Sequence, residues 1–201
     1  MGDEVDKLRL PVGGSPLVER VRHALAAVCD EVLLVGGRLP IEDSGRTNVS
    51  GTGPAGIRSV PDSRPGRAGP LAGVEAGLAA AGNERALIVA GDMPLLSPEL
   101  LAYLLELLDE PGALAAVPEA GGRIHPLCAA YARSVRPEVT RALDGGERAV
   151  YRLLERLDGV IRVPEALLRQ FGDPQRLLMN VNTPNDLRRA ESFLEQGSRE
   201  R

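Results

Sequence analysis

The stretch Arg85-Ala86-Leu87-Ile88-Val89-Ala90-Gly91-Asp92-Met93-Pro94 determines the fold class that we expect for this chain. Leu87 to Ala90 is a continuous apolar run with the length of a strand that is buried on both faces. Ser97-Pro98 then opens a leucine-rich helix, so the sequence predicts a strand, a tight turn and a helix. This pattern indicates an α/β protein with a mostly parallel sheet.

Asp92 has two interpretations from this stretch alone. In open parallel sheets ligands bind beyond the carboxyl ends of the strands, which is where Asp92 follows its strand. A carboxylate there suits a hard cation such as Mg²⁺ that carries substrate phosphates. Aspartates are also common in turns after strands, where they cap the turn and bind no ligand. The stretch does not choose between these two roles.

The composition is that of an ordinary globular domain. A length of 201 residues predicts one domain with a sizeable core. The net charge of -4 provides no basic surface of the kind that binds nucleic acid, so we expect no nucleic-acid partner. The sequence has no apolar run of about 18 residues and its first ten residues are rich in charge, so we expect neither a membrane span nor a signal peptide.

The cysteines and the lysine are informative because they are few. Cys29 and Cys128 lie far apart without CxxC spacing, which indicates neither a disulfide framework nor a zinc site and favours a reducing, cytoplasmic location. Lys7 is the only lysine among 24 basic residues. A lone lysine in an arginine-rich chain indicates a position that needs a compact ammonium rather than a planar guanidinium, with chance as the alternative.

The first third of the chain predicts a helix and then a strand. Ser15 is placed to cap the helix with Pro16 in its first turn, and Glu31 to Gly36 has the pattern of a buried strand. The apolar residues that share one face of the helix are Leu17, Val21, Ala24, Leu25 and Val28. Gly37 to Gly56 has the composition of a long surface connection.

A second strand and helix flank a loop rich in proline and glycine. Ile57 to Pro61 predicts a short strand that ends at Asp62, and a helix is expected from about Leu71 to Ala81. Between them, glycines ahead of the helix would let backbone N–H groups approach a phosphate. A plain connecting loop is the alternative.

The carboxyl-terminal half predicts an antiparallel element followed by short helices. Ala113–Val117 and Ile124–Tyr131 are expected to pair through a Gly121-Gly122 turn, beside the main sheet. His125 either contacts a ligand or has a structural role. The further expected elements are helices at Val135–Leu143 and Ala149–Leu157, a strand at Val160–Val163, a helical turn at Pro164–Phe171 and an extended segment at Leu177–Val181.

Two asparagines precede the last helix. Asn180 and Asn182 alternate to the same side of an extended backbone. Thr183 is expected to cap the helix that follows, with Asp186 completing a capping box. The two carboxamides either turn the chain or, opposite Asp92, form a second wall of a site.

Five motifs occur in a characteristic order along nearly the whole chain. They are Asp6-Lys7, Gly13-Gly14-Ser15-Pro16-Leu17, the loop Pro65-Gly66 to Gly69-Pro70-Leu71-Ala72-Gly73, Gly91-Asp92-Met93-Pro94 and Asn180-Val181-Asn182-Thr183-Pro184. As an ordered set they resemble the molybdenum cofactor guanylyltransferases. The resemblance implies one Rossmann-like, three-layer α/β/α nucleotidyltransferase domain at residues 1–196, followed by a flexible tail at 197–201. It also implies transfer of GMP from GTP to molybdopterin with release of pyrophosphate.

The resemblance implies roles for individual residues. Lys7 would contact GTP and act in catalysis, and Asp62 would contact the nucleotide. Asp92, the second catalytic residue, would hold Mg²⁺ and the nucleotide phosphates. Asn180 and Asn182 would lie on the molybdopterin side. These residues suit the reaction, because phosphoryl transfer depends mainly on positioning and charge neutralisation, and the attacking phosphate of molybdopterin is already an anion that needs no general base.

Cofactor and partners follow from the same resemblance. Mg²⁺ is the implied cofactor, and GTP and molybdopterin are the implied substrates. Molybdopterin-loading proteins and molybdoenzyme chaperones are the implied protein partners. We expect a monomer or weak homo-oligomer in the cytoplasm, with no nucleic-acid or membrane partner.

The chain departs from the family pattern at its N-terminus. The family opens with a strand and a Leu-Ala-Gly-Gly-x-Ser-x-Arg-Met-Gly loop, and this sequence begins at the Met-Gly of that pattern. The strand is central in the family's sheet, so we expect a slot of unpaired backbone and exposed apolar surface in its place. A start codon assigned at an internal methionine is our hypothesis for this departure.

Other functions stay open at this point. A sister nucleotidyltransferase that uses CTP or another acceptor is one, because the base-reading residues of the family lie largely in the absent segment. A non-catalytic relative that binds molybdopterin or partner enzymes is another, which the absent glycine loop supports and the presence of Lys7, Asp62 and Asp92 opposes. An α/β domain without nucleotide chemistry is the third.

Overall fold

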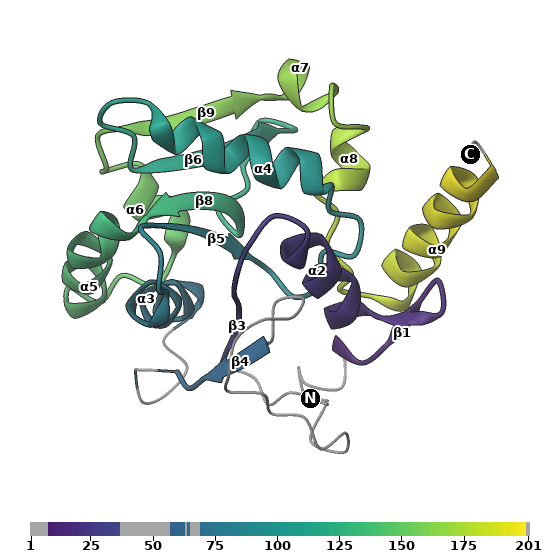
Figure 1. Cartoon of the computed structure of the whole chain (residues 1–201), viewed down its shortest axis with the longest axis horizontal. Helices are drawn as coiled ribbons and strands as arrows, with labels where there is room; N and C mark the ends of the chain where they lie inside the picture. Colours follow the sequence, from purple (N-terminus) through teal and green to yellow (C-terminus); the bar gives the residue numbers. More distant parts are fainter. Residues whose placement is uncertain (1–7, 37–56, 63, 65–68, 200–201) are drawn as a thin grey trace.

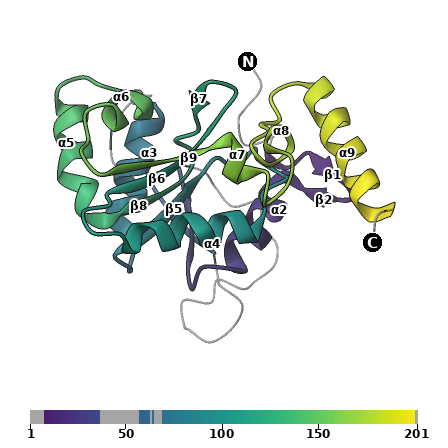
Figure 2. The ribbon, with the colours of Figure 1, turned by 90° about the horizontal axis from the view of Figure 1, so that it is seen from above.

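A computed structural model describes residues 8–36, 57–62, 64 and 69–199 of the chain. Figure 1 shows a central sheet with helices on both faces, and Figure 2 shows the same arrangement from above. Lys7 and the expected connection at 37–56 lie outside the described residues, as do residues 63, 65–68 and 200–201.

The described residues form short strands that alternate with helices. The strands are β1 Pro11–Val12, β2 Ser15–Pro16, β3 Val32–Val35, β4 Ile57–Val60, β5 Arg85–Val89, β6 Ala115–Ala120, β7 Arg123–Ile124, β8 Cys128–Ala132 and β9 Val160–Pro164. The helices are α2 Leu17–Ala26, α3 Pro70–Ala80, α4 Pro98–Glu106, α5 Arg136–Asp144, α6 Val150–Leu154, α7 Glu165–Leu168, α8 Pro174–Leu177 and α9 Pro184–Arg199, with short 3₁₀ turns at Leu107–Asp109 and Arg133–Val135.

The strand, turn and helix predicted around Asp92 are confirmed as β5 and α4. The apolar run forms β5, and α4 begins at Pro98 as its sequence predicts. Ser97 caps α4, because its Oγ accepts a hydrogen bond from the Leu100 backbone N–H at 3.2 Å. The strands expected at Glu31–Gly36 and Ile57–Pro61 are confirmed as β3 and β4, which pair in parallel.

The main sheet is mixed, with the order β5-β8-β6-β7 and β9 paired with β6. β8 runs antiparallel between β5 and β6, whereas β9 runs parallel to β6. The antiparallel element therefore lies inside the sheet, whereas we expected it beside the sheet. The reason is the composition of β8, in which Cys128 to Tyr131 are all buried and suit only a central strand.

Alternate residues of the central strands face two separate cores. Ala129 and Tyr131 of β8 join the core that packs under α3, α5 and α6, while Cys128 and Ala130 join the core that packs under α4. The chain thus forms three layers, helix, sheet and helix, as the resemblance implies (Figure 1). The helices cover the two faces of the sheet, so the loops that follow the strands lie at its ends.

The start of α2 differs from our expectation. Ser15 does not cap the helix, because Ser15-Pro16 forms β2 and pairs with Pro11–Val12 in a small hairpin. Gly13 and Gly14 have φ angles of 57° and 80°, which suit the tight turn of this hairpin. The prediction of an N-cap at Ser15 was therefore wrong, because the two glycines turn the chain first.

The helix α9 packs beside this hairpin at one end of the molecule (Figure 2). Val12, Leu17, Met179, Val181 and Ala190 form the small core that holds it. α9 continues to Arg199, so residues 197–199 are helical where we expected a flexible tail. In the described part of the chain, no helix is long and apolar enough to cross a membrane.

Candidate active site

Asp92 lies beyond the carboxyl end of β5, where it meets the segment before α9. The Asn180 Nδ2 donates a hydrogen bond to the Asp92 Oδ1 at 2.7 Å, and the Val181 backbone N–H donates to the Asp92 backbone oxygen at 2.9 Å. These two bonds join segments that are 88 residues apart in sequence. Of the two interpretations of the asparagine segment, the structure shows the contact with Asp92, made by Asn180 and Val181.

The loop after Asp92 is held from two further sides. Met93 is buried in the core below α4, and the Arg20 Nε of α2 donates to the Pro94 backbone oxygen at 3.2 Å. Burial lowers the pKa of Arg20. A Cβ added at Gly91 would lie 3.1 Å from the Leu8 Cδ2, so glycine permits this close approach. Asp92 thus stands on a strand end whose flanking residues are fixed.

Asn182 lies at the start of α9 and is exposed. The expected capping box is confirmed: the Asp186 N–H donates to the Thr183 Oγ1 at 3.2 Å, and the Thr183 N–H donates to the Asp186 Oδ2 at 2.8 Å. The Asn182 N–H also donates to the Asp186 Oδ2, at 3.1 Å. Hydrogen bonds from Thr183 and Asn182 lower the pKa of Asp186. The capping box therefore fixes the backbone that carries Asn182. The backbone next to Asn180 is fixed separately, by the hydrogen bond from the Val181 N–H to the Asp92 backbone oxygen.

The segment expected at Leu177–Val181 is not simply extended. Its start, Leu177, ends the short helix α8, and the extended backbone is limited to the residues around Asn180. The Asp173 side chain caps α8 by accepting from the Gln175 N–H at 3.0 Å. Pro174 at the first helical position, which we did not weigh, is the sequence signal for this helix.

Asp62 follows β4 and is exposed. Its Oδ1 accepts a hydrogen bond from the Arg64 N–H at 3.2 Å, in a local turn. No hydrogen bond or ion pair joins Asp62 to Asp92 among the described residues. The two carboxylates stand at the ends of two different strands, β4 and β5. Lys7, the remaining residue of the expected set, lies outside the described residues, and Leu8 is the first that the structure places.

A charged cluster beside Asp62 was not predicted. Arg64 makes two hydrogen bonds to the Glu75 carboxylate, at 2.9 and 2.8 Å, and a third to Asp144 at 2.6 Å. Thr140 donates to the same Glu75 carboxylate at 2.8 Å. These bonds to Glu75 and Asp144 raise the pKa of Arg64. The cluster joins Arg64, two residues after Asp62, to Glu75 of α3 and Asp144 of α5. It therefore positions the loop that carries Asp62.

Two backbone amides at the amino end of α3 are engaged in hydrogen bonds among the described residues. The Leu71 N–H donates to the Arg148 backbone oxygen at 3.3 Å, and the Ala72 N–H donates to the Gly69 backbone oxygen at 3.2 Å. Gly69 has a φ of 75° and lies against Arg148, where a Cβ would be 3.2 Å from the Arg148 oxygen. These two amides are therefore occupied, and residues 65–68 of the loop before them lie outside the described residues.

His125 has a structural position in the turn before β8. Its backbone N–H donates to the Pro118 backbone oxygen at 2.9 Å, and its backbone oxygen accepts from the Cys128 N–H at 3.0 Å. Burial lowers the pKa of His125, and the charge of Arg123 lowers it further. The two hydrogen bonds fix the backbone of His125 in this turn, and the lowered pKa favours the neutral form of the imidazole.

The carboxylates at this site suit a metal that is held mainly by substrate. Among the described residues, no group of three or more His, Cys, Asp or Glu side chains could enclose a metal ion. Mg²⁺ is commonly bound by one or two carboxylates together with phosphate oxygens and water. Asp92, a single oriented carboxylate at a strand end, fits that kind of site.

Solved structures share this arrangement over almost the whole chain. Molybdopterin-guanine dinucleotide biosynthesis protein A from Archaeoglobus fulgidus superposes with a TM-score of 0.73 at 29% identity, covering 94% of this chain and 91% of that protein. The 2-C-methyl-D-erythritol 4-phosphate cytidylyltransferase from Thermus thermophilus superposes with a TM-score of 0.66 at 23% identity, covering 94% of each. The fold is that of the nucleotidyltransferases.

Sequence relatives narrow this class to one family. The chain is 35% identical over 195 residues to a probable molybdenum cofactor guanylyltransferase from Pelotomaculum thermopropionicum, covering 97% of this chain and 87% of the relative. It is 35% identical over 192 residues to the molybdenum cofactor guanylyltransferase from Cereibacter sphaeroides, covering 94% and 88%. The model of the MobA-like NTP transferase domain matches residues 1–160, and the chain belongs to this family.

Proposed function

We propose that this protein transfers GMP from GTP to molybdopterin and releases pyrophosphate, as a molybdenum cofactor guanylyltransferase. The observation that carries the proposal is the 2.7 Å hydrogen bond from Asn180 to Asp92. It joins the residue expected to hold the nucleotide phosphates to a residue expected on the molybdopterin side. Membership of the MobA-like family and the relatives of that name support the same reaction.

The proposed reaction is a displacement at the α-phosphorus of GTP. A phosphate oxygen of molybdopterin forms the new bond to this phosphorus, the bond to the β-phosphate oxygen breaks, and pyrophosphate leaves with the electron pair. Mg²⁺ at Asp92 would neutralise the charge of the triphosphate. Lys7 would supply a second positive charge. The Asn180 amide orients the Asp92 carboxylate without adding charge.

The remaining residues have positioning roles in this proposal. Asp62 would contact the nucleotide, and the bonds of Arg64 to Glu75 and Asp144 would hold the loop that carries it. Asn182, exposed at the start of α9, would contact molybdopterin. Molybdopterin-loading proteins and molybdoenzyme chaperones are the partners we propose for delivery and handover in the cytoplasm.

The test compares an aspartate-to-asparagine substitution near the carboxyl end of β5, at Asp92, with the same substitution near its amino end, at Asp109. Asp92→Asn should lower pyrophosphate release from GTP and molybdopterin by about 10²- to 10³-fold, the usual loss for one electrostatic group of an active site. Asp109→Asn is the matched control, because Asp109 pairs with Arg85 at the opposite end of β5, 2.7 Å away. The assay contains Mg²⁺, with CTP as the competing nucleotide.

The outcomes separate the proposal from its rivals. Loss in Asp92→Asn alone, with folding retained and GTP preferred, is the expected result. Preference for CTP would indicate the sister nucleotidyltransferase. Full activity in Asp92→Asn, or molybdopterin binding without any transfer by the wild-type protein, would refute the proposed role of Asp92 or the proposed reaction.

A further inference from the structure

A cavity of about 340 Å³ opens between the turn before β8 and the starts of α3 and α6. Its lining residues are Pro70 of α3, Pro126 and Leu127 of the turn, and residues 148–151 at the start of α6. Most of these side chains are apolar, and one of them, Tyr151, is aromatic. Small-molecule sites are typically cavities of about 300–1,000 Å³ with mainly apolar and aromatic walls. The cavity therefore has the size and the composition that suit a small ligand.

This cavity lies at the same edge of the sheet as Asp92. β8 runs antiparallel to β5 and begins with Cys128 opposite Val89, so the turn before β8 lies at the carboxyl end of β5. The Ala90 N–H, two residues before Asp92, donates a hydrogen bond to the Leu127 backbone oxygen at 2.8 Å. Ligands bind at this edge in open α/β sheets. The cavity is thus beside the strand end that carries the candidate active site.

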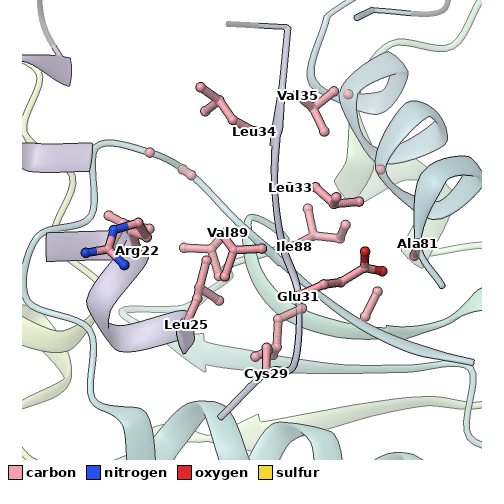
Figure 3. Close-up of a pocket in the computed structure, with 18 of the residues that line it drawn as sticks. Arg22, Leu25, Cys29, Glu31, Leu33, Leu34, Val35, Ala81, Ile88 and Val89 are labelled. Atoms are coloured by element: carbon pink, nitrogen blue, oxygen red, sulfur yellow. The ribbon is translucent and has the colours of Figure 1, made fainter. Parts of the chain in front are cut away.

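A larger cavity connects this one with the backbone next to Asp92. It has a volume of about 650 Å³ and lies between β3 and β5, where Leu33 and Ile88 face it (Figure 3). Pro70 and Leu127 line both cavities, and Gly91 lines the larger one. A ligand in the smaller cavity therefore lies close to the loop that begins at Gly91.

Tyr151 is the one exposed aromatic side chain at this edge of the sheet. The sequence has three tyrosines, two phenylalanines and no tryptophan, and all five aromatic residues are in the described part of the chain. Tyr131 is fully buried. Tyr103 packs against Phe171 with ring centroids 5.2 Å apart, and Phe193 lies beneath two guanidinium groups. Tyr151 is 44% exposed and lines the cavity, so its ring is accessible to a ligand.

The start of α6 is held in place by hydrogen bonds. The Glu147 carboxylate accepts the backbone N–H groups of Arg148 and Ala149, at 2.8 and 2.9 Å. The Arg152 Nε donates to the Tyr151 hydroxyl at 3.1 Å, and its guanidinium lies 5.7 Å from the centre of the ring. These contacts orient the Tyr151 ring while they leave part of it exposed.

The opposite walls of the cavity are rigid. Pro70 and Pro126 have ring-fixed backbone angles. The buried Tyr131 hydroxyl donates to the Pro126 backbone oxygen at 2.8 Å, and the Leu71 N–H donates to the Arg148 backbone oxygen at 3.3 Å. A pre-formed slot of this kind binds a flat, rigid ring with little loss of conformational freedom on either side.

We propose that this cavity binds the pterin ring system of molybdopterin, with Tyr151 stacked on the ring. The proposal rests on the proposed function, because that reaction uses an acceptor with a flat heteroaromatic ring at one end and the attacking phosphate at the other. The phosphate must reach the α-phosphorus at Asp92, so the ring must lie at the same edge of the sheet. Guanine is also a flat ring, but Asp62, its expected contact, follows β4, which belongs to a different sheet from β8.

Fluorescence titration with 6-hydroxymethylpterin tests the binding site without the reaction. This probe has the pterin ring but no phosphate, so its binding does not require GTP, Mg²⁺ or Asp92. Tyr151→Ser should weaken binding by about 10- to 100-fold, the usual loss for one stacking aromatic side chain. Tyr151→Phe keeps the ring and should bind as tightly as wild type. Equal affinity of wild type and Tyr151→Ser, or no saturable binding to wild type, would overturn the proposal.

Two further variants complete the binding test. Ala149→Phe, at a half-buried position of the lining, fills the cavity from α6 and should abolish binding of the probe. Leu167→Ser is the control, because Leu167 is an exposed apolar side chain of α7 that lies outside the lining. It should bind the probe as wild type does. Unchanged binding by folded Ala149→Phe would show that the probe binds elsewhere and would contradict the proposal.

The transfer reaction separates this proposal from the proposed function. Tyr151→Ser should raise KM for molybdopterin and leave kcat and KM for GTP unchanged, as expected when a uniform binding contact is removed. A rise in KM for GTP instead, with guanosine bound more tightly than the probe, would assign the cavity to the nucleotide base and overturn the proposal. An unchanged KM for molybdopterin would also overturn it. Tyr151-dependent binding of the probe by a wild-type protein that transfers no GMP would support the pterin site and contradict only the proposed function.

Discussion

Asn180 holds the Asp92 carboxylate through a neutral donor, and this neutrality is testable. Asn180→Asp would place a second carboxylate about 2.7 Å from the first. Two carboxylates at this distance cannot both ionise easily, so the apparent pKa of the pair rises. We expect kcat/KM for GTP to fall most at pH 6 and to recover as pH increases toward 9. Asn182→Asp should follow the wild-type pH profile, because the hydrogen bond described for Asn182 joins it to Asp186 and not to Asp92. An Asn180→Asp profile parallel to wild type would argue against this electrostatic role.

Glu75 is the residue whose importance the sequence conceals most. It accepts hydrogen bonds from Arg64 and Thr140 and is only 8% exposed. Glu75→Ala leaves Arg64 without its main partner and should cost about 2 kcal/mol, less than the 3–5 of a fully buried pair, because the Arg64 side chain is 27% exposed. Asp144→Ala removes an exposed partner and should cost at most about 1 kcal/mol. Urea unfolding measures both, and equal losses would show that burial does not decide the difference.

The capping box of α9 makes a pH-dependent contribution to the stability of the protein. Hydrogen bonds from Thr183 and Asn182 lower the pKa of Asp186, so its contribution to stability is complete above the unfolded pKa of about 3.9 and is lost as pH falls through the folded value. Asp186→Asn should therefore lower Tm at pH 7, and the difference from wild type should shrink below about pH 4. Asp158→Asn, at an exposed site, is the control. A constant difference down to pH 2 would contradict the assigned bonds.

Elements with a strong local signal were predictable, and elements decided by tertiary contacts were not. Ser97-Pro98 and Thr183 with Asp186 carry their capping chemistry in the sequence, and the structure confirms both. The antiparallel pairing of β8 was predicted, but its place between β5 and β6 depends on which strands bury it. The hairpin β1–β2 was missed because Ser15-Pro16 also has the pattern of a helix start, and the Gly13-Gly14 turn decided the outcome.

The sequence indicated the segments that carry the candidate site, but not the contacts that support them. A position opposite Asp92 was one of two interpretations of Asn180 and Asn182, and Asn180 is hydrogen-bonded to Asp92. The cluster of Arg64, Glu75 and Thr140 joins three separate segments and has no local pattern. Its only sequence signal is Glu75, the single charged residue in the otherwise apolar helix α3.

Nucleotide binding should stabilise the whole fold, because Asp62 and Asp92 extend from β4 and β5 of different sheets. A ligand that binds only the folded protein at a hundredfold excess over its Kd adds about 2.7 kcal/mol, which corresponds to a rise in Tm of about 5–10 °C. We expect this rise with GTP and Mg²⁺, a smaller one with CTP, and none in Asp92→Asn or in the presence of EDTA. Differential scanning calorimetry measures it, with Asp109→Asn as the matched control. A rise in wild type that survives in Asp92→Asn would mean that GTP binds elsewhere.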